Sequence, residues 1–168
     1  FTVMHFRLSL FFFLVFFALV SCQPESKEVV QHYGTGQISR RHNEINGKKE
    51  GAMTEYYPDG KVKGVRQFEN DIQVGKTVYY YPSGPVKEVQ YYDQGKMNGG
   101  DTVFYENGRP KFLRSFDHGK LNGYIRKWAE DGSLIYEARY AQDQLVEVKG
   151  QDIDPDSFPH LTDTLIHE

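Results

Sequence analysis

The sequence predicts an all-β fold, an elongated single-layer antiparallel sheet built from consecutive β-hairpin repeats of 24 residues. Two regularities carry this prediction. One glycine recurs every 24 residues and a second follows it nine residues later, while aromatic residues recur five and seventeen residues after the first glycine. β-Branched and aromatic residues, which favour strands, are common between these positions. A fixed period of this length indicates a repeat architecture.

Four copies hold all of these positions. The glycines are Gly51, Gly75, Gly99 and Gly123, followed by Gly60, Gly84, Gly108 and Gly132. The aromatics are Tyr56, Tyr80, Phe104 and Trp128, followed by Phe68, Tyr92, Phe116 and Tyr140. We expect the glycines to shape turns and the aromatics to form the structural core of the sheet.

The first 21 residues predict a secretory signal peptide that forms a helix, with the true start at Met4. His5 and Arg7 provide a short basic segment, and residues 8–20 form an apolar run. That run is shorter than the roughly 20 residues that a membrane-spanning helix needs.

Cys22, the only cysteine in the chain, directly follows this apolar run. The stretch "LVSC" resembles a bacterial lipobox, in which the cysteine receives a lipid. The alternative is an ordinary secreted protein with an incidental cysteine. We expect a lipid on Cys22 that holds the protein to a membrane, with residues 22–28 as a tether. A single cysteine excludes an intramolecular disulfide.

The repeats are predicted to span residues 29–149. A degraded copy covers residues 29–45, with His32 and Tyr33 at aromatic positions and Gly36 at the turn. The remaining copies are residues 46–69, 70–93, 94–117 and 118–141, with a partial copy at 142–149. Pro, Asp, Asn or Ser before the second glycine predicts a type I turn closed by a left-handed glycine, which pairs Tyr105 with Arg109.

Alternation of side chains along these strands predicts two different faces. The core face carries the four pairs Tyr56 with Val62, Tyr80 with Val86, Phe104 with Pro110 and Trp128 with Leu134, together with Phe68, Tyr92, Phe116 and Tyr140. The opposite face is a candidate binding face made of Tyr57, Tyr81, Tyr105, Lys63, Lys87 and Lys111. Tyrosine and lysine suit the binding of a partner. They equally suit a solvated sheet face that binds nothing.

Charge is divided unevenly along the mature chain. Residues 22–149 contain 19 Lys and Arg against 18 Asp and Glu, whereas residues 150–168 contain five acids and no Lys or Arg. We expect this acidic tail to be extended or disordered, although Phe158, Leu161 and Leu165 could fold back over a sheet edge. Neither part has the basic excess of a nucleic-acid-binding protein.

No pattern predicts catalysis, a metal site or a cofactor. The histidines are not spaced as metal ligands, and we expect them on the exposed surface. Acidic pairs such as Glu130 and Asp131 fall in predicted turns, and no serine has a nucleophile-elbow context. The sequence therefore predicts that the protein is not an enzyme.

The segment "GKTVYYYPSGPVKEVQYYDQGKMNG", Gly75 to Gly99, resembles the MORN-repeat variant of bacterial proteins. The resemblance covers residues 46–149 and implies an elongated antiparallel sheet of hairpins. Many members of that family carry a lipoprotein signal, and a subgroup is labelled as antitoxin components of toxin–antitoxin pairs. The chain departs from the pattern at Ala129, where tyrosine is usual, and at Asp71 and Asp143, where glycine is usual.

These observations favour a non-catalytic interaction or scaffold module in the bacterial cell envelope, lipid-anchored outside the cytoplasm at the outer membrane or the periplasmic face. We expect a protein partner, because long sheet edges and broad faces suit an extended partner better than a small molecule. An antitoxin and a cell-wall or glycan-binding module are the alternatives.

Overall fold

The computed structural model describes residues 24–149 and 151–152, which form one antiparallel sheet of 13 strands and no helix. The expected signal peptide, Cys22 and most of the acidic tail lie outside the described residues. The strands are β1 (Ser26–His32), β2 (Ile38–Ile45), β3 (Lys48–Tyr56), β4 (Val62–Glu69), β5 (Ile72–Tyr80), β6 (Val86–Asp93), β7 (Lys96–Met97), β8 (Gly99–Phe104), β9 (Pro110–Asp117), β10 (Lys120–Trp128), β11 (Leu134–Ala141), β12 (Gln144–Val148) and β13 (Gln151–Asp152).

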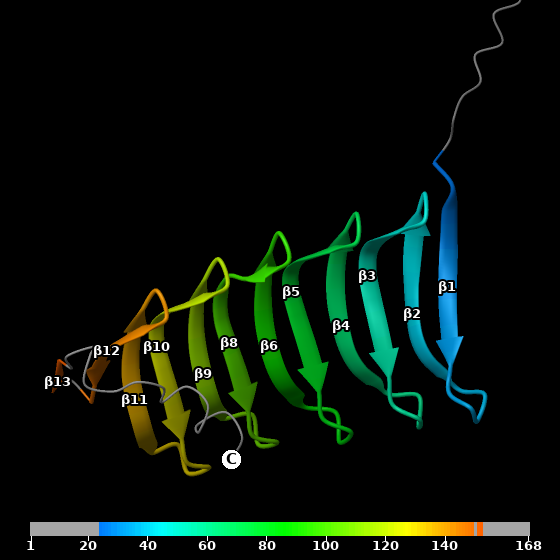
Figure 1. Ribbon diagram of the computed structural model, residues 1–168. Coiled ribbons are helices and arrows are strands. Elements are labelled where there is room, and N and C mark those ends of the chain that lie inside the picture. The colour runs from blue at the N-terminus through cyan, green and yellow to red at the C-terminus, as the bar shows by residue number, and fades with distance from the viewer. Residues whose placement is uncertain (1–23, 150, 153–168) are drawn as a thin grey trace, which may run out of the picture.

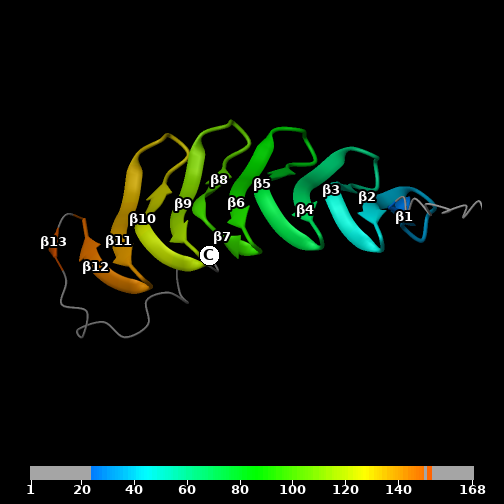
Figure 2. The same ribbon diagram turned by 90° about the horizontal axis from the view of Figure 1, so that it is seen from above.

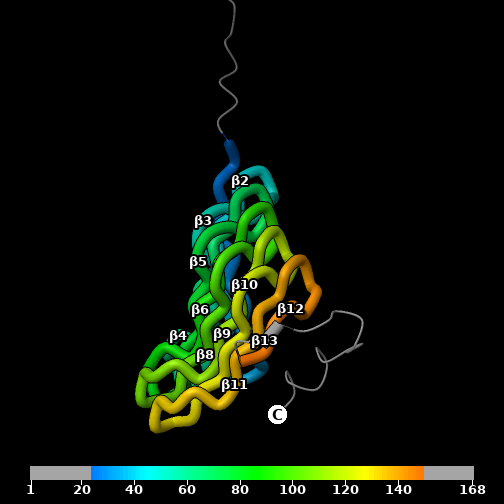
Figure 3. Tube along the Cα trace, turned by 90° about the vertical axis from the view of Figure 1, so that its left-hand side faces the viewer, coloured from blue at the N-terminus to red at the C-terminus, as the bar shows by residue number. Residues whose placement is uncertain are grey.

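Each strand pairs with its neighbours in chain order, apart from the short β7, which pairs with β6 (Figure 1). The prediction of an all-β single-layer sheet of consecutive hairpins is therefore confirmed. The sheet is long and curls along its strands, and the repeats follow one another along a single axis (Figures 2 and 3). β1 begins at Ser26, inside the segment expected as a tether, and β13 lies inside the expected tail.

The turn within each repeat has the predicted form. The Tyr105 amide donates to the Arg109 carbonyl at 2.9 Å, and the Gly108 amide donates back to the Tyr105 carbonyl at 2.9 Å. Gly108 has a φ of 82°, a left-handed conformation that glycine adopts without a steric penalty. The Asn107 side chain accepts the Arg109 amide at 2.9 Å, which explains the short polar residue before the glycine.

Two-residue turns join one repeat to the next, and both of their residues have positive φ. In the turn between β4 and β5, Asn70 has a φ of 50° and Asp71 a φ of 69°. The Asp71 amide donates to the Lys49 carbonyl, and the Asp71 carboxylate accepts the Lys49 amide at 2.9 Å. This carboxylate hydrogen bond accounts for an aspartate where the repeat usually has glycine. Asp143 bonds the Leu121 amide in the same way at 2.7 Å.

An extra residue in every hairpin changes the assignment of the faces. Tyr56 pairs with Val62 as predicted, but the next residue, Glu55, pairs with Gly64, so Lys63 is left over as a β-bulge. A bulge interrupts the alternation of side chains along the strand that contains it. Every residue of β4 after Lys63 therefore lies on the face opposite to the one that simple alternation gives.

The prediction that both aromatic series share one face is wrong for this reason. The same register shift occurs beside Tyr80, Phe104 and Trp128. We call the two sides the inner face and the outer face. The inner face carries Phe68, Tyr92, Phe116 and Tyr140, and the outer face carries Tyr56, Tyr80, Phe104 and Trp128 with their partners Val62, Val86, Pro110 and Leu134.

Among the described residues, the buried side chains gather on the inner face, because in a single layer only the inside of the curl can cover a side chain. They include Met53, Thr77, Asp101 and Ile125, one from the same position of each copy. The apolar core lies at the C-terminal end, where Ile125, Ala138 and Tyr140 pack together. Trp128, on the outer face, is only half-buried.

Candidate interaction surfaces

A line of tyrosine hydroxyls ties each repeat to the next. Each hydroxyl donates to the backbone carbonyl of the aromatic residue that precedes the equivalent turn in the following copy. We call this line the tyrosine ladder. Its hydrogen bonds are Tyr33 to the Tyr56 carbonyl at 2.5 Å, Tyr57 to Tyr80 at 2.7 Å, Tyr81 to Phe104 at 2.6 Å and Tyr105 to Trp128 at 2.8 Å.

Three of these tyrosines were predicted to form a binding face with three lysines. The Lys87 ammonium lies 6.0 Å from the centre of the Tyr81 ring, and the Lys111 ammonium lies 5.6 Å from that of Tyr105. Lys63 holds the equivalent sequence position in its copy, as the unpaired residue after Val62. The tyrosines are half-buried, and burial, followed by the nearby Glu106, raises the pKa of Tyr81. That this face binds a partner stays a prediction.

The fourth copy departs from this arrangement at two positions. Ala129 stands at the tyrosine position and Ile135 at the lysine position. A tyrosine at position 129 would reach toward a further copy, and among the described residues only β13, Gln151–Asp152, follows β12. The loss of the tyrosine therefore fits its place at the end of the ladder. Ile135 instead leaves an apolar side chain in the open, 49% exposed.

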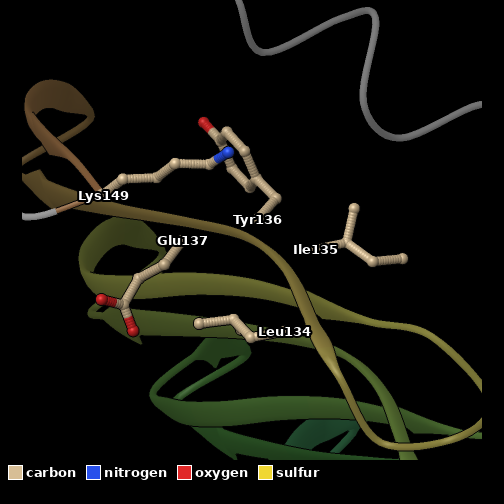
Figure 4. Close-up of a pocket in the computed structure, with 5 residues that line it drawn as sticks. All are labelled: Leu134, Ile135, Tyr136, Glu137 and Lys149. Atoms are coloured by element: carbon tan, nitrogen blue, oxygen red, sulfur yellow. The ribbon is translucent and has the colours of Figure 1, made fainter.

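A hollow of about 430 Å³ lies beside this last hairpin, lined by Leu134, Ile135, Tyr136, Glu137 and Lys149. Leu134 is 53% exposed, although it is the partner of Trp128 in the strand register. Figure 4 shows Lys149 extending from the end of β12 toward Tyr136, with Ile135 and Leu134 further along β11. The hollow thus has apolar walls, one cationic side chain and one carboxylate, Glu137, which is paired with Arg126.

Ionic side chains fill the inner face at the N-terminal end. Glu55 Oε1 lies 2.7 Å from an Arg40 guanidinium nitrogen and 2.6 Å from one of Arg66. Burial alone would raise the pKa of Glu55, but the two arginines outweigh it and hold that pKa below its ordinary value. A smaller hollow of about 190 Å³ adjoins this cluster, and its lining includes Tyr33, Tyr56 and Lys63.

A second ionic cluster lies on the inner face at the centre of the sheet. Asp101 Oδ2 accepts hydrogen bonds from Arg114, whereas the buried Oδ1 has no hydrogen-bond donor among the described residues. Burial and the charge of Asp101 raise the pKa of the neighbouring Glu88. The Gln90 amide donates to Glu88 Oε1 at 2.7 Å.

Neither ionic cluster was predicted from the sequence, because its positions carry unlike residues from copy to copy. Arg66, for example, aligns with Gln90, Arg114 and Ala138. A period search detects positions that repeat one residue type, so it finds the glycines and aromatics and misses these side chains. For the larger hollow the sequence did carry a signal, because Ala129 and Ile135 depart from the repeat in the hairpin beside it.

One of the repeat copies matches the model of a known protein family. Residues 49–70, which cover most of β3 and β4, match the family model described as the MORN repeat variant. This hairpin is therefore similar to the MORN repeat variant. The matched unit shares its strand register with the copies that follow it. Comparison with curated proteins finds no match to this chain.

The histidines of the repeat array are only partly where the sequence placed them. His118 lies in a turn between repeats and is exposed, as expected. His42 is 6% exposed, so the expectation of a surface position is wrong for this residue. It faces inward because its strand position is equivalent to that of Arg66, and its Nε2 lies 3.1 Å from Glu44 Oε1.

Within residues 24–149 and 151–152, no three His, Cys, Asp or Glu side chains form a group that could hold a metal ion. The same part of the chain has no helix that is long and apolar enough to cross a membrane.

Proposed function

We propose that this repeat protein is a non-catalytic interaction module that presents an extended sheet to a protein partner. The observation that carries the proposal is the open architecture. Within residues 24–149 and 151–152, the sheet is a single layer, its outer face has no second layer over it, and its terminal strands β1 and β13 each pair on one side only. Such edges and faces are the elements that extended protein partners use.

Two carboxylates of the inner face, those of Glu55 and Asp101, support a non-catalytic role. Glu55 is neutralised by two arginines, and Asp101 is paired with Arg114. A general acid or base has to exchange protons with a substrate, and a carboxylate held between guanidinium groups is a poor proton carrier. Both described hollows are shallow parts of a curved surface that polar and apolar residues line together.

We further propose that a lipid on Cys22 anchors the module in the bacterial cell envelope, outside the cytoplasm. The support is the apolar run that ends in "LVSC". Because β1 begins at Ser26, only residues 23–25 would separate the anchor from the sheet. Three extended residues span about 10 Å, so β1 would stand at the membrane surface with the array projecting from it.

The anchor is tested by labelling cells with a radioactive fatty acid and by fractionating their membranes. We expect the label and the membrane association in the wild-type chain and the loss of both in Cys22→Ala. Equal labelling and equal fractionation of the two forms would refute the anchor without touching the interaction proposal.

The partner is tested by purifying the tagged chain from solubilised envelopes, identifying the co-purifying protein and measuring its affinity for the purified module. If the tyrosine–lysine face binds, the double variant Lys87→Glu and Lys111→Glu lowers that affinity. The matched control is Lys120→Glu, an exposed lysine at the opposite end of the strands. A toxin-like partner would favour the antitoxin alternative, and binding to purified cell wall without any protein partner would favour the glycan alternative.

A further inference from the structure

The last hairpin of the array has an unexpected surface. Terminal copies of a repeat protein usually carry a polar outer surface, because no neighbour covers them. Here Leu134 and Ile135 are 53% and 49% exposed and line the hollow of about 430 Å³ together with Tyr136. In the three preceding copies, the position of Ile135 holds Lys63, Lys87 and Lys111. An apolar residue at this one copy points to a contact that the other copies lack.

We propose that residues 153–168 of the same chain occupy this hollow and cap the array. The segment leaves the sheet at Asp152, three residues after Lys149, which itself lines the hollow. Sixteen residues reach at most about 55 Å when fully extended, so the hollow lies within easy range. A covalently attached segment also docks at a high effective concentration, so a few apolar contacts are sufficient.

The composition of the segment complements the hollow. It contains the apolar residues Ile153, Phe158, Leu161, Leu165 and Ile166, and Phe158 stands 24 residues after Leu134, one repeat further on. It also contains four acids and no Lys or Arg. The hollow offers the Lys149 ammonium, and the other charged residue of its lining, Glu137, is already paired with Arg126. Apolar side chains would cover Leu134 and Ile135, and acids would lie near Lys149.

A second copy of the chain fits the same surface less well. A symmetric contact between two copies of this patch places equivalent residues near one another, so it would bring two Lys149 ammonium groups together. The acidic segment brings the opposite charge to that lysine. The attached segment is therefore the occupant that the charges favour.

The chain contains a natural reporter for the test. Trp128 is the only tryptophan, it is half-buried, and it lies directly across the hairpin from Leu134. Acrylamide quenching of its fluorescence measures how far the last hairpin is covered. The probe is applied to the full chain and to the triple variant Phe158→Ser, Leu161→Ser, Leu165→Ser. The control, Thr162→Ser with Thr164→Ser, changes polar residues of the same segment.

If the segment caps the hairpin, the triple variant shows a larger quenching constant and a red-shifted emission, and the control matches the wild type. Ile135→Lys introduces the lysine that the other copies carry at this position. In that background, we expect the chain with the triple change and the chain without it to give the same quenching constant. Circular dichroism confirms that the sheet is intact in each variant. Equal quenching of the wild type and the triple variant overturns the proposal. Quenching of the wild type that falls with rising protein concentration also overturns it, because a second copy is then the occupant.

Discussion

A single hydroxyl group joins each repeat to the one after it. The Tyr105 hydroxyl reaches 2.8 Å from the Trp128 carbonyl oxygen, and the equivalent bonds recur along the array. The rings are half-buried, so they also cover part of the sheet near the turns. A tyrosine at this position therefore contributes to the coupling between neighbouring repeats.

Tyr105→Phe should lower the free energy of unfolding by about 0.5–1.5 kcal/mol, because it removes one hydrogen bond and keeps the ring. Chemical denaturation of the purified chain measures the change. Tyr91→Phe is the control, since Tyr91 is 43% exposed on the outer face. Equal losses in the two variants would mean that the ladder bond adds nothing.

The pKa values of two inner-face glutamates, Glu55 and Glu88, are shifted in opposite directions. Arg40 and Arg66 overcome the effect of burial and lower the pKa of Glu55 below 4.5. Burial and the neighbouring Asp101 raise the pKa of Glu88 above 4.5. The difference lies in the neighbours, two cations in one case and a carboxylate in the other.

Glu55 should stabilise the sheet at neutral pH and cease to do so in acid. Because its pKa is lower in the folded chain than in the unfolded chain, its contribution is present above pH 4.5 and is lost as the pH falls through the folded value. Glu55→Gln should therefore be less stable than the wild type at pH 7 and approach it at low pH. Denaturation curves across this range check the prediction, and a constant difference at all pH values would contradict it.

Glu88→Gln should have the reverse effect and raise the stability at pH 7. The raised pKa means that the contribution of Glu88 is present below pH 4.5 and is lost as the pH rises through the folded value. A glutamine amide has the shape of the protonated acid and can donate to Asp101 Oδ1, for which the described part of the chain supplies no donor. Stability measured against pH should become flatter in the variant. A loss of stability at pH 7 would show that the ionised Glu88 is the favourable form.

At the scale of the strands, the β-bulge decides which side chains meet. Lys63 is the additional residue in its hairpin, and it shifts Gly64 into register with Glu55. Gly64 then lies under Tyr79 of the next strand, and a Cβ atom on it would come within 2.6 Å of the ring. The corresponding pair one repeat later is Glu88 with Val103. In these two copies, glycine therefore faces tyrosine and glutamate faces valine.

Gly64→Ala should lower the free energy of unfolding by roughly 1–3 kcal/mol, because the added methyl group forces the Tyr79 ring out of its place. The double variant Gly64→Ala with Tyr79→Val should recover part of that loss, since valine occupies this position in the following repeat. Thermal or chemical denaturation measures both. Two results together would show that the contact has no energetic role. Gly64→Ala alone would leave the free energy of unfolding unchanged, and the double variant would be no more stable than the single variant Tyr79→Val.

The turns and strands were predictable from the sequence, whereas the faces were not. Gly108 and Asn107 specify their turn through local backbone geometry, which depends on a few adjacent residues. The face that carries Phe68 depends on the bulge at Lys63, and a lysine in a strand gives no sign that it will be left unpaired. The inner-face partners of Glu55 come from β2 and β4, so no local pattern reports them.

At the scale of the whole molecule, each repeat contacts only its neighbours in the sheet. Pairing follows chain order from β1 to β13, with no crossover connection. Stability in such an array is approximately a sum over repeats and over the interfaces between them. The inner face nevertheless changes along the axis, from the arginine–glutamate cluster near β3 to the apolar cluster of β10 and β11.

Deletion of residues 70–93, one complete repeat, should leave a folded but less stable sheet. The deletion joins equivalent positions, so the strand register and both faces are kept. The denaturant m-value should fall in proportion to the surface lost. Deletion of residues 71–93 is the control, because a shift of one residue turns every side chain of the following strand to the other face. Equal folding of the two variants by circular dichroism would contradict this account.

The amino-acid sequence by itself determined the repeat length, the hairpins, their turns and the order of the strands, because all of these depend on local backbone preferences repeated every 24 residues. Only the tertiary structure decided which face is buried, which charges pair and where the apolar hollow lies. Those features arise between strands that are distant in the chain, and their register depends on bulges that the period does not reveal. The last hairpin shows both contributions: Ala129 marks the end of the ladder in the sequence, and the fold alone places Ile135 and Leu134 beside Lys149.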